Sequence, residues 1–310
     1  MRVSGAPTMT VTASATNDAT PAAQKTALHV EGDPAIDALL AGVFNSESWI
    51  VQRTPTNASA LELVTARAYN LIVTSERNTG HEDILLLREI RRIRPHSCLL
   101  ILTAHGTPQD VIDAMREHAF SYFSTPFSPV SLAEMIRRIN EGACWDDGIE
   151  VISATPEWLR LKARCDFKTA DRLLQFLQEI AVLPEPERME VAVALRELLY
   201  NAIEHGGQLD PTKNVELEYV RAHSMVTCRI SDHGPGFDFD QIPHAAVANP
   251  PDDPVHHIGV REEKGLRPGG YGVLMARKLV DEVIYSQNGS EVLLVKYLRP
   301  RQQTQSTGLH

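Results

Sequence analysis

The sequence has 310 residues, of which 43% are hydrophobic, and it carries a formal net charge of -10. This length and hydrophobic content predict two domains with two packed cores. The negative charge disfavours nucleic acid or an anionic membrane as the main partner, because both are themselves negative. No run approaches the roughly 18 apolar residues that a membrane span needs.

Residues 1–26 are rich in Ala, Thr, Ser and Pro and contain no apolar run of signal-peptide type. We therefore expect a disordered tail and a cytoplasmic protein. The four cysteines are scattered, without CxxC or Cys/His ligand spacing, so the sequence predicts reduced thiols rather than a zinc site or a disulfide framework. They are Cys98, Cys144, Cys165 and Cys228.

After the tail, short strand-type runs alternate with amphipathic helical segments. This alternation predicts a parallel, doubly wound α/β sheet whose ligand crevice lies at the carboxyl ends of the strands. The expected strands are 27–30, 49–53, 71–74, 98–103 and 121–123, and the expected helices are 34–44, 57–67, 82–93, 108–117 and 129–140.

Three motifs of this first part resemble the receiver domain of response regulators. The segment VEGD (30–33) stands where receivers carry an acidic pair, and ILTA (101–104) resembles the strand that ends in the switch hydroxyl. YFSTPF (122–127) resembles the last strand with its Lys-Pro-Phe. The resemblance implies a (βα)5 receiver-like domain over residues 27–142.

The receiver pattern fails at two residues that its chemistry needs. The phosphoacceptor aspartate position falls on Ser75, and the position of the lysine before the proline falls on Thr125. A serine hydroxyl cannot form an acyl phosphate, and no ammonium group remains to neutralise a phosphoryl group. Glu76 is a poor substitute, because a shift of one residue on a strand points the side chain to the other face. We expect a pseudo-receiver used for regulation or dimerisation; a receiver still switched by phosphate is the disfavoured alternative.

A polar, turn-like segment then leads into a second domain. We place a linker at 143–156, the second domain at 157–299 and a C-terminal tail at 300–310. The expected strands are 149–152, 158–163, 215–221, 225–231, 283–286 and 292–297, and the expected helices are about 168–181, one carrying residue 197, and 274–283. Asn288-Gly289 is a favoured turn pair for the closing hairpin.

The segment RELLYNAIEHGG (196–207) predicts the end of an amphipathic helix. Glu197 and Asn201 lie one turn apart on its polar face, whereas Val191, Leu195, Leu198 and Ala202 follow the spacing of a buried face. Gly206-Gly207 is a plausible stop, since glycine accepts the left-handed conformation after a helix. Taken alone, the polar face is compatible with simple solvation.

A second motif, SDHGPGF (231–237), follows a predicted strand. Asp232 can present a carboxylate to an amine-bearing base, while Gly234 and Gly236 let the backbone approach closely. A plain turn explains the same residues when they are considered alone.

Residues 238–264 contain four prolines and three histidines, and this composition predicts a long mobile loop. His256-His257 has no second ligand pair at fixed spacing, so a solvated loop pair is favoured over a metal site. The glycines Gly269, Gly270 and Gly272 then open into a helix, where backbone N–H groups can receive phosphates. A hinge or a dinucleotide fingerprint is the alternative, but this cluster does not directly follow a strand.

Together the three motifs resemble the N box and two glycine boxes of the GHKL ATPase/kinase superfamily, which implies a Bergerat α/β sandwich that binds ATP and Mg2+. By this resemblance Asn201 coordinates Mg2+ and Asp232 binds the adenine amino group. The lid glycines contact the phosphates, and Glu197 is the catalytic base.

The compact form of the motifs is most similar to anti-sigma-factor serine kinases. No histidine lies between Gly142 and Asn201, which excludes a sensor histidine kinase, and the chain ends about 12 residues after Leu298, which disfavours gyrase-like and chaperone ATPases. The resemblance implies a serine/threonine kinase that phosphorylates a STAS-type anti-anti-sigma partner, and a homodimer. The alternative is a non-catalytic ATP-binding module that sequesters a sigma factor or another regulator.

Overall fold

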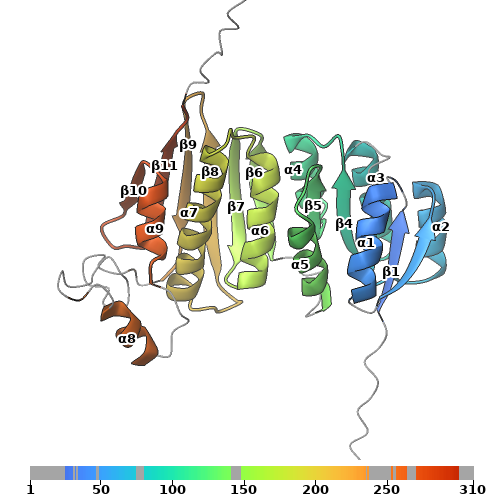
Figure 1. Ribbon diagram of the computed structural model, residues 1–310, viewed down its shortest axis with the longest axis horizontal. Coiled ribbons are helices and arrows are strands. Elements are labelled where there is room, and N and C mark those ends of the chain that lie inside the picture. Colours follow the sequence, from blue (N-terminus) through green and yellow to red (C-terminus); the bar gives the residue numbers. More distant parts are fainter. Residues whose placement is uncertain are drawn as a thin grey trace, which may run out of the picture.

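The computed structural model describes residues 25–30, 32, 34–46, 49–74, 80–140, 148–234, 236, 253, 256–263 and 270–299. These residues form two β-sheets that lie side by side, each with its own helices (Figure 1).

The first sheet has five parallel strands in the order β2-β1-β3-β4-β5. Strands β1, β3, β4 and β5 are almost entirely buried, as a sheet covered on both faces by helices requires, whereas the edge strand β2 is buried only at Thr54. The doubly wound receiver fold is therefore confirmed. The strands are β1 (Thr26–Val30), β2 (Ile50–Thr54), β3 (Leu71–Val73), β4 (Cys98–Thr103) and β5 (Ser121–Ser124), and the helices are α1 (Pro34–Ser46), α2 (Asn57–Ala66), α3 (Gly80–Ile93), α4 (Pro108–Arg116) and α5 (Pro129–Asn140).

The second sheet has six antiparallel strands in the order β10-β11-β9-β8-β7-β6. Helices α6, α7 and α9 cover one of its faces (Figure 1), which confirms the α/β sandwich. The strands are β6 (Ile149–Thr155), β7 (Trp158–Arg164), β8 (Asn214–Arg221), β9 (Met225–Ser231), β10 (Glu282–Tyr285) and β11 (Glu291–Tyr297), and the helices are α6 (Phe167–Ile180), α7 (Glu187–Asn201), a π-helical turn η1 (Ala202–Gly206), α8 (His256–Glu263) and α9 (Gly272–Leu279).

The expected continuous loop over 238–264 is wrong at its end, because residues 256–263 form α8. The solvated histidine pair is also wrong for His257, whose side chain is 0% exposed. Its ring packs edge-on against Tyr271, with 4.5 Å between the ring centroids. This tertiary contact explains the burial, and the local composition of the segment does not reveal it.

Helix α6 joins the two sheets. The Arg172 side chain is buried and donates hydrogen bonds to the carbonyl oxygens of Phe120 at 2.8 Å and Ala119 at 3.2 Å. Seven residues further along α6, the Glu179 carboxylate accepts a hydrogen bond from the backbone N–H of Ser124 at 3.0 Å. Both contacts reach β5 and the residues just before it, so α6 is bound directly to the receiver domain.

The cysteines differ from the expectation in one respect. Cys165 and Cys228 are free and buried, but Cys98 is disulfide-bonded, which corrects the prediction of reduced thiols throughout. Cys144 lies outside the described residues. Within the described ranges, no helix is long and apolar enough to cross a membrane.

Candidate nucleotide-binding site

Helix α7 separates a core face from a polar face, as its sequence predicts. Val191, Leu195 and Leu198 are at most 4% exposed and pack toward the sheet, and Ala202 continues this face into η1. Glu197 and Asn201 are half-buried on the polar side. Because four residues make about one helical turn, the two side chains belong to one stripe.

The helix ends in a π turn rather than in a left-handed glycine. Residues 202–206 are π-helical, and Gly207 keeps a right-handed conformation with φ of -77°. The positive φ angles occur later, at Gln208 (59°) and Leu209 (54°). The expected glycine cap is therefore wrong, although the helix does stop here. π-Helical turns are rare, and those that interrupt α-helices frequently lie at functional sites.

Asp232 lies against the end of this helix. It follows β9, and its Oδ1 accepts a hydrogen bond from the N–H of Gly234 at 2.8 Å. A Cβ atom at Gly206 would lie 2.1 Å from Cγ of Asp232, and one at Gly234 would lie 2.7 Å from the carbonyl oxygen of Gly206. Both positions therefore need glycine. Burial raises the pKa of Asp232, whereas the hydrogen bond from Gly234 opposes that rise.

The closing hairpin fixes the position of this aspartate. The Asp232 N–H donates to the carbonyl oxygen of Ser290 at 3.0 Å. Gly236 has a φ of 72°, and a Cβ atom there would lie 1.6 Å from the carbonyl oxygen of Asn288. Gly236 therefore lies in close contact with the β10–β11 turn. In that turn Gly289 has the expected left-handed conformation, with φ of 72°.

Glu197 meets the predicted lid at the start of α9. A Cβ atom at Gly272 would lie 2.4 Å from Oε2 of Glu197, so the carboxylate touches the first residue of that helix. Helices α7 and α9 run side by side (Figure 1). Gly270 has a φ of 101°, a conformation that favours glycine. The positive end of the α9 dipole therefore lies beside Glu197. Gly269 lies outside the described residues.

The predicted site residues thus form two groups along one helix. Asp232 and Gly234 gather at Gly206, while Glu197 gathers with Gly272, and Asn201 lies between the two groups. At about 1.5 Å per residue, the groups are separated by roughly 13 Å along α7 and η1. This spacing suits an extended ligand with two distinct ends. The contact of Gly206 with Asp232 was not predicted, because the Gly-Gly pair has a sufficient local explanation as a helix stop.

A Mg2+ ion at this site would be held by an amide oxygen and by the nucleotide, and not by a cluster of acidic side chains. Within the described part of the chain, no three His, Cys, Asp or Glu side chains converge as metal ligands. An amide oxygen such as that of Asn201 can contribute one ligand to Mg2+, which usually completes its shell with phosphate oxygens and water. Asn201 is half-buried on the polar face of α7, and the first backbone N–H groups of the neighbouring α9 have no acceptor within that helix, so the residues present fit a bound Mg-nucleotide.

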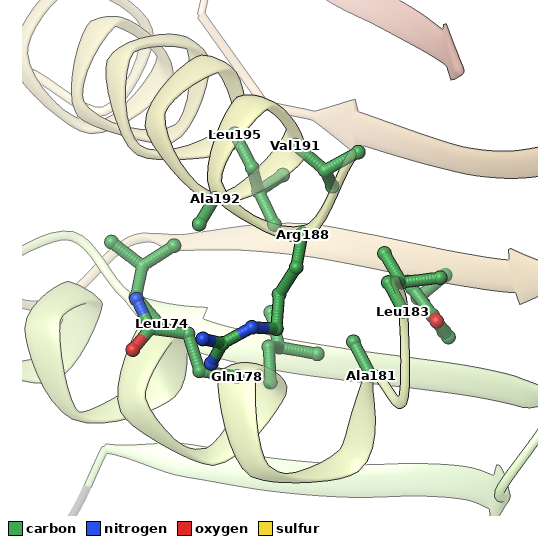
Figure 2. A pocket seen from close by; sticks show the side chains of 10 residues that line it. Leu174, Gln178, Ala181, Leu183, Arg188, Val191, Ala192 and Leu195 are labelled. Atoms are coloured by element: carbon green, nitrogen blue, oxygen red, sulfur yellow. The ribbon is translucent and has the colours of Figure 1, made fainter. Parts of the chain in front are cut away.

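A separate cavity lies between α6 and α7 and is distinct from these two groups (Figure 2). It holds about 360 Å³ of space that is partly open to solvent, and its walls are mainly apolar side chains such as Leu174, Leu183 and Val191. Arg188 is the one charged side chain in this lining and is already paired with Glu185, so this cavity is not the candidate nucleotide site.

Two positions of the receiver motifs, Thr103 and Thr125, lie in the described part of the chain. Thr103, at the switch-hydroxyl position, is fully buried, and its Oγ1 accepts a hydrogen bond from the N–H of His105 at 3.2 Å. Thr125 follows β5 directly and brings no ammonium group to this end of the sheet. Asp33, Ser75 and Glu76 lie outside the described residues.

Two known domain families match successive parts of the chain. Residues 27–137 match the response regulator receiver domain, and residues 162–296 match the histidine kinase-like ATPase domain. The chain is therefore a receiver domain followed by a histidine kinase-like ATPase domain, and the second match implies ATP binding.

The individual proteins to which the chain is similar share about a quarter of their aligned residues with it. Serine-protein kinase RsbW of Oceanobacillus iheyensis is 27% identical over 110 residues, covering 35% of this chain and 65% of that protein. Serine-protein kinase RsbW of Listeria monocytogenes serotype 4a is 25% identical over 114 residues, covering 36% and 68%. Transcriptional regulatory protein GlrR of Escherichia coli K12 is 26% identical over 140 residues, covering 43% of this chain but 31% of that protein. The chain thus spans about a third of the regulatory protein that it matches.

A solved structure of a CheY-like receiver domain protein from Methanospirillum hungatei is also similar. It covers 38% of this chain and 95% of that chain, at 22% identity and a TM-score of 0.35.

Gly206→Ala is expected to weaken ATP binding about 10-fold or more. The added methyl group would overlap the Asp232 carboxylate, which would have to move from its place, and a displaced or unpaired buried polar group costs on the order of 1–3 kcal/mol. Titration calorimetry with ATP measures the effect. Gly42→Ala is the matched control, because nothing lies within 4 Å of a Cβ atom there. Equal affinity for the two variants would contradict the placement of Asp232 in the site.

Proposed function

We propose that this chain is a Mg-ATP-binding serine/threonine protein kinase of the anti-sigma-factor type, which phosphorylates a STAS-type anti-anti-sigma partner. The main support is the contact of the Glu197 carboxylate with Gly272 at the start of α9, one helical turn from Asn201. This arrangement supports a role for Glu197 as the base, because its carboxylate lies beside the start of the predicted lid. The similarity to serine-protein kinases named RsbW supports the same activity.

Each site residue then has a distinct role in the proposal. Asp232 accepts a hydrogen bond from the adenine amino group, and its own backbone is fixed by Ser290. Asn201 would contribute its amide oxygen to Mg2+, and the glycines Gly269, Gly270 and Gly272 would hold the phosphates. When bound, Mg-ATP supplies the phosphoryl group and the charge neutralisation for its transfer. Glu197 takes the proton from the incoming serine or threonine hydroxyl at one of its carboxylate oxygens.

A second candidate is an ATP-binding module that holds a sigma factor or another regulator without turnover. The observation in its favour is that two residues of the receiver motif are replaced, with Thr125 at the lysine position and Ser75 at the aspartate position. A receiver that has lost its own chemistry is compatible with a fused domain that only binds. In that case nucleotide would serve to order the α9 region.

Transfer of label from ATP decides between the two candidates. The full chain is incubated with γ-labelled ATP, Mg2+ and STAS-type proteins, and we expect label on a serine or threonine of the partner. The same partner with that residue changed to alanine is the control. Tight ATP binding without any labelled partner would favour the binding module, whereas no ATP binding at all would contradict both candidates.

A further inference from the structure

A chain of polar contacts runs from the receiver domain to the helix that carries the candidate site. Arg138 of α5 pairs with Asp171 of α6, with 2.5 Å between Nη1 and Oδ2. The other oxygen of Asp171 accepts a hydrogen bond from the Tyr200 hydroxyl of α7. Arg196, one turn earlier on α7, donates to the same hydroxyl at 3.5 Å. We refer to Arg138, Asp171, Tyr200 and Arg196 as the interdomain chain.

The middle of the interdomain chain is largely shielded from solvent and packed against aromatic rings. Asp171 is 14% exposed, and Arg138 is 27% exposed. The Tyr200 ring packs on the Phe167 ring, with 4.8 Å between the ring centroids. The Arg196 guanidinium lies 5.2 Å from the centroid of the Tyr200 ring. Burial, followed by the hydrogen bond to Asp171, raises the pKa of Tyr200 to about 12, so its hydroxyl remains the donor at neutral pH. Partial burial makes these contacts stronger than exposed ion pairs.

The interdomain chain crosses an open space instead of a packed surface. Its residues Arg138, Asp171 and Arg196 border a cleft between α5, α6 and α7 that encloses about 600 Å³, partly open to solvent. The lining is mostly polar, with Met135, Leu174 and Ala192 as its apolar members, so polar contacts connect α5 to α7 here. A displacement of Arg138 would therefore act on α7 through Asp171 and Tyr200, in addition to the direct contacts of α6 with the receiver domain.

The sequence positions of the last two members connect the interdomain chain to the site. Tyr200 immediately precedes Asn201, and Arg196 immediately precedes Glu197. Since an α-helix is stiff along its axis, a rotation or shift of α7 at Tyr200 moves Asn201 and Glu197 with it.

We propose that Asp171 and Tyr200 are positioning residues of the ATP site, and that Arg138 lets the receiver domain control it by holding α7 in the orientation seen in the structure. This inference rests on the proposed function only where it takes Asn201 and Glu197 as ligand-binding residues. It assigns a signalling route to a receiver that lacks the residues for its own phosphorylation. Any event that moves α5 would change nucleotide affinity at α7.

The test uses the full chain with Arg138→Ala, Tyr200→Phe and the double variant. Arg137→Ala is the matched control, because Arg137 is the exposed neighbour of Arg138 on α5. We expect Arg138→Ala and Tyr200→Phe each to weaken Mg-ATP binding about 3- to 30-fold, within the range of coupling mutations. The double variant should bind Mg-ATP no more weakly than the single variant with the lower affinity, because both changes break the same connection. Calorimetry gives the affinities.

Hydrogen exchange of the amides at 196–206 provides a readout that does not depend on nucleotide. We expect these amides to exchange at least about 3-fold faster than in the wild type in both single variants, and at the wild-type rate in Arg137→Ala. Tyr200→Phe keeps the ring on Phe167, so it separates loss of the contact from unfolding, which circular dichroism monitors. Arg138→Ala and Tyr200→Phe behaving like Arg137→Ala in exchange and affinity would overturn the inference. A wild-type chain that does not bind ATP would instead refute the proposed function, and the exchange data alone would then decide the coupling.

Discussion

Glu197→Gln is expected to leave Mg-ATP affinity nearly unchanged and to slow phosphoryl transfer by about 100- to 10,000-fold. Glutamine keeps the size of the side chain and its contact with Gly272, but its amide does not accept a proton from a hydroxyl group. Positioned general bases contribute rate factors of about this size. The transfer rate is measured in single turnover with labelled ATP, and the affinity by calorimetry.

The matched control for this variant is Glu150→Gln, which changes an exposed glutamate of β6. It should transfer at the wild-type rate. Undiminished transfer by Glu197→Gln would refute the role of Glu197 as the base. A large loss of affinity in the same variant would instead assign Glu197 to ligand binding.

Asn201→Ala is expected to abolish the part of nucleotide affinity that depends on Mg2+. The amide oxygen is a hard ligand of the kind that Mg2+ prefers, and alanine offers no replacement. We expect affinity to fall about 10-fold or more in the presence of Mg2+ and to change little when the cation is removed by a chelator. Calorimetric titrations with and without Mg2+ measure this difference.

Asn201→Asp tests the same role by rescue, because the carboxylate restores an oxygen ligand of similar size. Its Mg2+-dependent affinity should lie well above that of the alanine variant. If the alanine variant loses affinity equally with and without Mg2+, Asn201 binds the nucleotide directly and not through the cation.

The sequence predicts the helices and strands well wherever periodicity is local. The receiver half alternates short apolar runs with amphipathic segments, and its ten elements lie within a few residues of their expected positions. The buried face of α7 is also as predicted, because Val191, Leu195 and Leu198 are all buried. Hydrophobic spacing of this kind reflects the burial of one face and needs no knowledge of distant residues.

The errors occur where a distant contact decides the structure. Helix α8 lies in a region whose prolines and histidines predict a loop, and His257 is buried against Tyr271, 14 residues further along the chain. Gly206 has a local explanation as a helix stop, whereas its actual constraint is the carboxylate of Asp232. Within the site, residue types predicted the candidates, but only the fold reveals that Glu197 meets Gly272.

The hydrogen bonds of Arg172 also bear on how such a protein can change during evolution. Its guanidinium donates to the carbonyl oxygens of Phe120 and Ala119, which belong to the other domain. An ATPase domain separated from this receiver would expose that arginine and the surface around it, and an exchanged receiver would have to supply the same carbonyl groups. The two domains are therefore not freely exchangeable modules. We expect residues of α6 and residues next to β5 to co-vary among related sequences.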